Sequence, residues 1–190
     1  IVAVLDEAFE GLDRARTNAE ANLQNARELF ENSLIAVFEE VVARANRLTL
    51  AQASSSFGRG RSRHRPRNAP FLYGGAYPFV QTGDIRNSDG TVLEFTQTYN
   101  EQGLAQSKLW PAGTICITIA ANIAETAVLG FDACFPDSII GMVADPSVTF
   151  PEYVEFMLRY FAAELKALGK GSAQDNINLA TFESATFPFP

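Results

Sequence analysis

The stretch IVAVLDEAFEGLDRARTNAEANLQNARELFENSLIAVFEEVVARA occupies residues 1–45 and contains no proline and a single glycine, Gly11. Ala, Glu, Leu and Arg, which favour helices, make up much of it. Apolar or small residues recur from Ile1 to Val37 in ten steps over 36 residues, a mean spacing of 3.6. This is the period of a straight helix rather than the 3.5 of a strict heptad repeat. The stretch therefore predicts an amphipathic helix roughly 60–65 Å long.

A helix of this length cannot bury its whole apolar stripe against the domain that follows it. An intramolecular helix hairpin would be the ordinary solution, but the sequence holds no second helix of comparable length. We therefore favour a helix partner from another chain. Small residues would let the two helices approach closely, and Asn18, Asn22 and Asn25 would set their register. The residues predicted to pair are Leu5, Leu12, Ala15, Ala19, Leu23, Ala26, Phe30, Leu34 and Val37.

The rest of the chain reads as short strands, turns and one helix. Strands are predicted, with turns at 87–90 and 110–113, over residues 77–85, 91–99, 114–120, 127–135 and 138–144. PEYVEFMLRYFAAELKALG (151–169) predicts an amphipathic helix with Pro151 in its first turn and Gly169 at its end. The expected fold class is α+β: a long, coiled-coil-forming N-terminal helix (1–46), then a compact domain (47–190) with a mostly antiparallel, barrel-like sheet and a packed helix.

Charge is unevenly distributed along the 190 residues, although the net charge is −7. Residues 1–40 carry a charge of −6, residues 41–67 carry +7 with no acid, and residues 68–190 carry −8. An all-arginine block in an acidic protein can attract phosphate locally, while the acidic remainder discourages indiscriminate coating of nucleic acid.

The segment FGRGRSRHRPR (57–67) places an arginine at every second position from Arg59 to Arg67. In an extended chain this spacing puts all five guanidinium groups on one side. Such groups can bind phosphates and leave one or two forks for guanine O6 and N7. A disordered basic linker is an equally good interpretation of this composition. His64, the single histidine, is most simply a further donor, because no zinc-spaced Cys/His set surrounds it.

A second candidate contact region is the polar loop GKGSAQDNI (169–177), whose Lys170 and Gln174 suit phosphate or base contacts but equally suit helix capping. Arg86 and Lys108 are weaker candidates, because each could simply be a surface residue. Tyr73 and Tyr77 are possible packing partners. The predicted DNA-binding set is Arg59, Arg61, Arg63, His64, Arg65, Arg67, Arg86, Lys108, Lys170 and Gln174.

Several other classes of protein find no support in the sequence. It contains no phosphate-binding loop, nucleophile elbow or metal-ligand cluster, so we expect no catalysis, metal or cofactor in this chain. Cys116 and Cys134 lie in apolar runs typical of buried, reduced thiols, and a disulfide is the minor alternative. No apolar run approaches the length of a membrane-spanning helix. We expect a soluble cytoplasmic protein, and the start at Ile1 suggests a fragment or a trimmed chain.

Four segments together resemble the specificity subunits of type I restriction-modification enzymes. Residues 1–12 and 22–31 resemble that family's conserved-region helix, and residues 58–85 resemble the opening of one class of its target recognition domains. GSAQDNI (171–177) and FPFP (187–190) resemble its domain exit. The resemblance spans nearly the whole chain, and the four segments occur in the family's order.

The resemblance implies sequence-specific binding of double-stranded DNA without catalysis. A full subunit of the family has two recognition domains separated by two antiparallel helices, reads a bipartite site, and docks methyltransferase subunits, which use S-adenosylmethionine, and indirectly the restriction subunit. One helix and one domain imply half of such a subunit, or a half-size subunit that forms a homodimer. The 59–67 arginines and the 169–177 loop would grip the duplex. The alternatives are a coiled-coil assembly protein and an RNA-binding module that uses the arginine-rich loop.

Overall fold

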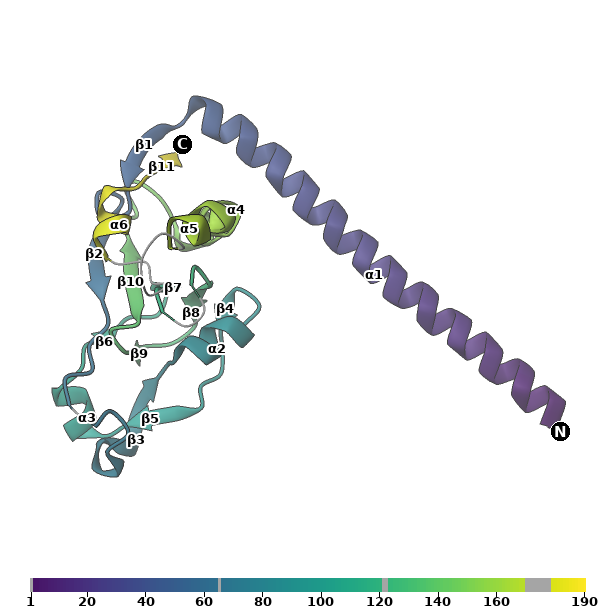
Figure 1. The fold of residues 1–190 in the computed structure, drawn as a ribbon, viewed down its shortest axis with the longest axis horizontal. Helices are drawn as coiled ribbons and strands as arrows, with labels where there is room; N and C mark the ends of the chain where they lie inside the picture. Colours follow the sequence, from purple (N-terminus) through teal and green to yellow (C-terminus); the bar gives the residue numbers. More distant parts are fainter. Residues whose placement is uncertain (1, 65, 121–122, 170–178) are drawn as a thin grey trace. The chain divides into compact units, whose positions relative to one another are not determined.

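The structure is a computed structural model that describes residues 2–64, 66–120, 123–169 and 179–190, in two compact units: residues 1–44 and 45–190 (Figure 1). The first unit is the helix α1 (Val2–Arg44), so the predicted long helix is confirmed. Its predicted pairing residues are exposed in this chain, except Leu34, which is half-buried. Leu12 and Leu23, for example, are 64% and 55% exposed.

The second unit contains a five-stranded sheet covered by a helix. Its strand order is β2 (Ser54–Arg59), β10 (Ile139–Ala144), β7 (Ile115–Thr118), β8 (Thr126–Leu129) and β4 (Thr91–Val92). Neighbouring strands are antiparallel except β4 and β8. All four residues of β7 are buried, as expected of a central strand, and α4 (Pro151–Tyr160) packs against β7, β8 and β10.

A four-stranded sheet lies beside it and carries its own small core. Its order is β5 (Gln97–Tyr99), β3 (Tyr73–Phe79), β9 (Ala133–Cys134) and β6 (Leu109–Trp110). Phe79 and Tyr99 stack with ring centroids 4.1 Å apart, in a cluster with Leu72 and Cys134. The larger cluster includes Trp110 and Phe135, so β6 and the residue after β9 connect the two cores.

A two-stranded sheet brings the start and the end of the second unit together. β1 (Asn46–Thr49) pairs antiparallel with β11 (Thr186–Phe189), as Figure 1 shows near the C-terminus. Phe187 and Phe189, two residues apart in β11, are both buried, and so is Pro188 between them. Tyr153 donates a hydrogen bond to the carbonyl of Pro188 at 2.7 Å.

Short helices complete the unit: η1 (Pro70–Leu72), α2 (Thr82–Asn87), α3 (Glu101–Ala105), α5 (Ala162–Gly169) and α6 (Leu179–Ser184). The predicted helix 151–169 is present with Pro151 in its first turn, but it breaks at Phe161 into α4 and α5. The α+β fold class is confirmed.

Three predicted strands were too long. Residues 82–87 form α2 rather than the end of a strand, because Asp84 accepts a hydrogen bond from the Gln81 amide at 2.8 Å and so starts a helix. The stretches 91–99 and 127–135 are each divided between two different sheets. The described residues form three sheets rather than the single barrel-like sheet that was expected.

The prediction of reduced cysteines is confirmed. Cys116 lies in β7 and Cys134 in β9, in different sheets, and both thiols are free and buried. Burial raises the pKa of both thiols.

Candidate nucleic-acid interface

The arginine segment, residues 59–67, is attached to the domain through its backbone. The Gly60 amide donates to the Ile139 carbonyl at 2.8 Å, and the Arg61 amide donates to the Phe135 carbonyl at 3.0 Å. Only glycine fits at position 60, because a Cβ atom there would lie 2.3 Å from the Phe135 carbonyl oxygen. The segment therefore continues the edge of the five-stranded sheet as an ordered strand-like extension.

Side chains hold the following residues in place. Ser107 donates to the Arg61 carbonyl at 2.7 Å, and the buried Ser62 hydroxyl lies 3.3 Å from the Tyr99 hydroxyl. The His64 amide donates to Gln106 Oε1 at 2.9 Å, and the His64 ring packs edge-on against Phe71. The interpretation of the segment as a disordered linker is thus wrong for residues 59–64.

Exposure alternates from Arg59 to Arg63 as the period of two predicted. Gly60 and Ser62 are buried, whereas Arg59, Arg61 and Arg63 are exposed. Because Gly60 and Ser62 face the domain, the side chains of Arg59, Arg61 and Arg63 lie on the opposite, outer side of the segment. Such a row can bind successive phosphate groups without first ordering the chain.

Lys108 lies next to this row. Its Nζ atom is 3.3 Å from the centroid of the Trp110 ring and 3.2 Å from the Ser56 hydroxyl. Burial lowers the pKa of Lys108, and the charge of the neighbouring Arg61 lowers it further. Lys108, a weaker candidate from the sequence, therefore lies beside Arg61 and extends the basic surface. Its ammonium group already contacts Trp110 and Ser56 within the domain.

Arg67 differs from the other arginines of the segment. Its guanidinium forms an ion pair with Asp137 at 2.5 Å, and its carbonyl accepts a hydrogen bond from the Tyr73 hydroxyl at 2.7 Å. Burial raises the pKa of Tyr73 to about 12, with a smaller contribution from Tyr99. Tyr77 instead donates to Glu101 at 2.7 Å, which raises its pKa. Asp137 partly neutralises the charge of Arg67, so Arg67 is less suited to bind a phosphate group than an arginine without such a partner.

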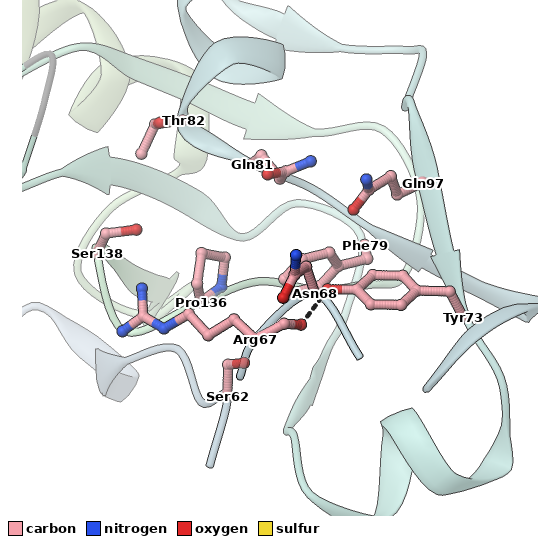
Figure 2. Close-up of a pocket in the computed structure, with 10 residues that line it drawn as sticks. All are labelled: Ser62, Arg67, Asn68, Tyr73, Phe79, Gln81, Thr82, Gln97, Pro136 and Ser138. Carbon is pink, nitrogen blue, oxygen red and sulfur yellow. Dashed lines mark hydrogen bonds between the residues drawn. The ribbon is translucent and has the colours of Figure 1, made fainter. Parts of the chain in front are cut away.

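A pocket of about 310 Å³ opens between the arginine segment and the four-stranded sheet (Figure 2). The segment contributes Ser62, Arg67 and, just beyond it, Asn68. β3, the start of α2 and β5 contribute the other wall. Figure 2 shows the side chains of Asn68, Gln81 and Gln97 around Phe79.

The remaining candidate residues lie elsewhere or cannot be placed. Arg86 is exposed in the last turn of α2 and lines a different hollow, with Arg159 and Lys166. No described hydrogen bond or ion pair joins Arg86 to the arginine segment. Arg65, Lys170 and Gln174 lie outside the described residues, as does most of the 169–177 loop.

Residues 2–64, 66–120, 123–169 and 179–190 contain no group of three or more His, Cys, Asp and Glu placed to hold a metal ion. Within the same ranges, no helix is both long and apolar enough to cross a membrane.

The amide pocket does not follow from the sequence patterns. Gln81 lies in the predicted strand 77–85, which ends earlier in the structure, and Gln97 lies in the predicted strand 91–99, which is divided in two. Only the capping pattern of Gln81 and Asp84 could have indicated that a helix starts here. No local pattern indicates that Asn68 and Gln97, 29 residues apart, face the same hollow.

Comparison with known families gives this basic surface a context. Residues 59–190 match the family model described as the type I restriction modification DNA specificity domain. The chain belongs to this specificity-domain family. The matched region begins at Arg59, so it includes the whole arginine segment and the pocket.

Solved structures share the fold. The HsdS subunit from Thermoanaerobacter tengcongensis superposes with a TM-score of 0.61 at 15% identity, over 93% of this chain and 44% of that one. A chain from a structure on complex assembly and conformational transition of the type I R-M system superposes with a TM-score of 0.61 at 16% identity, over 93% of this chain and 46% of that one. The type I restriction-modification S subunit from M. genitalium superposes with a TM-score of 0.59 at 14% identity, over 85% of this chain and 41% of that one. The chain thus spans less than half the length of these proteins.

Proposed function

We propose that this specificity-domain protein is the DNA-recognition part of a type I restriction-modification system, and that it reads one half of a bipartite site. The observation that carries this proposal is the ordered arginine segment. Arg59, Arg61 and Arg63 are exposed on a backbone that Ile139, Phe135 and Ser107 hold in place. The family match over residues 59–190 supports the same function.

Electrostatics also favours local binding to a duplex. The arginine segment and Lys108 form a basic surface in a protein whose net charge is −7. Phosphate contacts with these residues would release counterions, so affinity should fall steeply with salt. The acidic remainder of the protein would repel DNA that approaches from other directions.

The chain's own role is recognition, and it performs no catalysis. Chemistry would come from a methyltransferase subunit docked on the assembly, with the restriction subunit associated indirectly. Such a complex would act in the cytoplasm, where it meets DNA. The family match and the similar solved structures give no support to the two alternatives, a coiled-coil assembly protein and an RNA-binding module.

The helix α1 supplies the spacer in this proposal. Its exposed stripe, including Leu12, Leu23 and Phe30, is expected to pair with a second helix and to dock the methyltransferase subunit. That helix belongs either to a second copy in a homodimer or to another part of a longer subunit. The pairing of β1 with β11 places Phe189 opposite Asn46, two residues after α1 ends, so the last strand of the domain lies beside its first strand.

Selection of binding sites from a random duplex pool tests the proposal. The wild-type chain should enrich one preferred half-site. Arg61→Ala combined with Arg63→Ala should reduce the slope of log affinity against log salt by roughly 2, since each lost phosphate contact contributes about 0.9. Arg14→Ala combined with Arg27→Ala removes the same charge from α1 and is the matched control. Failure of the wild type to enrich any sequence would refute the proposal.

A further inference from the structure

The pocket beside the arginine segment has the chemistry of a base-edge reader rather than a phosphate site. Its lining includes three primary amides, Asn68, Gln81 and Gln97, together with Phe79 and Pro136. Each amide presents a donor and an acceptor side by side. A phosphate site would instead offer only donors and cations.

Several of the pocket's polar groups are already committed within the domain. The Arg67 guanidinium is paired with Asp137, and the Tyr73 hydroxyl donates to the Arg67 carbonyl. Gln81 belongs to the capping box that starts α2. By contrast, the side chains of Asn68 and Gln97 are exposed, and neither forms a hydrogen bond within the part of the chain that the structure describes. These two amides are therefore available to a ligand.

The fold holds both residues on fixed backbone. Gln97 lies directly opposite Phe79 in the ladder between β5 and β3, and Phe79 stacks on Tyr99 beneath it. Asn68 lies in a tight turn closed by a hydrogen bond from the Ala69 amide to the Pro66 carbonyl. A specific base contact requires this kind of rigid support, because a mobile amide can form hydrogen bonds with several different bases and discriminates poorly between them.

We propose that Asn68 and Gln97 recognise an adenine in the major groove of the duplex, while Arg61 and Arg63 bind the flanking phosphates. An amide complements adenine N6 and N7, whereas a free guanidinium would select guanine. Asp137 neutralises the single arginine of the pocket wall, so adenine is favoured. This assignment deepens the proposed function and rests on it.

The pocket reads the edge of a stacked base rather than a base turned out of the helix. An extruded base is held by stacking between aromatic or apolar faces. Phe79 is only 4% exposed, and its ring stacks on Tyr99, so it offers no open face. Tyr73 also packs against Tyr99, with ring centroids 5.0 Å apart.

The test compares the sites that wild type, Asn68→Ala, Gln97→Ala and Gln97→Glu select from a random duplex pool. Gln102→Ala, which removes an exposed amide from α3 outside the pocket, is the matched control. Binding of the wild-type site is then titrated by fluorescence anisotropy, with each adenine replaced in turn by 7-deazaadenine. Thermal unfolding confirms that every variant is folded, as expected for exposed positions.

We expect each alanine variant to lose its preference at one A·T pair and to bind the wild-type site about tenfold or more weakly. 7-Deazaadenine at that position should weaken the wild type and leave Gln97→Ala unaffected. Gln97→Glu should shift the preference toward cytosine, whose N4 donates to a carboxylate. Gln102→Ala should select the wild-type site.

Two results would overturn the assignment, and they have different consequences. If both alanine variants select the unchanged wild-type site, the pocket does not read the base, but the proposed function stands. If the wild type selects no site at all, the proposed function fails and this assignment fails with it.

Discussion

Replacing Gly60 by alanine should destabilise the protein by about 1–3 kcal/mol, the usual cost of forcing an extra methyl group into a packed site. The new Cβ would lie 2.3 Å from the Phe135 carbonyl oxygen and 2.4 Å from both the Phe135 ring and the Pro136 carbonyl oxygen. Two of these three atoms belong to the backbone, so no flexible side chain can simply move away. The segment must shift, and the hydrogen bond from Gly60 to Ile139 would be weakened.

Gly83→Ala is the matched control, and its effect should have the opposite sign. Gly83 lies exposed in α2, and an added Cβ would meet no atom within 4 Å. Alanine is favoured over glycine inside a helix by roughly 0.5–1 kcal/mol, so this variant should be slightly more stable.

Urea unfolding measures both effects as free energies, and anisotropy with duplex DNA measures the functional result. Gly60→Ala should also weaken DNA binding, because the shift displaces Arg61 and Arg63. An unfolding free energy equal to that of the wild type would refute the conclusion that the arginine segment packs tightly against Phe135.

Three further predictions concern other parts of the chain. For the homodimer form of the proposal, Leu12→Glu combined with Leu23→Glu should abolish dimerisation in analytical ultracentrifugation, and a dimer that persists would exclude the exposed stripe as its interface. Phe189→Ala should lower the unfolding free energy by about 3–5 kcal/mol in urea titrations, because Phe189 is only 2% exposed; a loss under about 1 kcal/mol would contradict the burial of β11. Burial raises the pKa of the Glu155 carboxyl above its ordinary value, although Arg159 and Thr126 act in the opposite direction. The contribution of Glu155 to stability is therefore fully present below its ordinary pKa, and it is lost as the pH rises through the raised pKa of the folded state. Glu155→Gln should therefore flatten the decline in urea midpoint toward neutral pH, and an identical pH profile would contradict the shift.

The sequence predicted features that depend on local periodicity. The helix α1 follows from an apolar spacing of 3.6, and the alternating exposure of Arg59, Arg61 and Arg63 follows from a spacing of two. Both patterns are local, because each residue's environment repeats along a single element.

Features created by contacts between distant segments could not be predicted. Nothing near Gly60 reveals that Phe135 lies against it, and that contact decides between an ordered segment and a linker. The pairing of Arg67 with Asp137, 70 residues away, likewise weakens a prediction that the arginine spacing alone had favoured. The predicted strand boundaries were wrong where a capping residue, such as Gln81, starts a helix or where the chain passes from one sheet to another.

The most direct test of the account is an anisotropy titration of the wild-type chain with two duplexes. One carries the selected half-site, and the other differs from it at two base pairs of that site. Because each wrong pair costs about 1–3 kcal/mol, the altered duplex should bind at least about 30-fold more weakly. Equal affinity for both duplexes would mean that the arginine segment binds phosphate alone, and it would contradict sequence recognition by this domain.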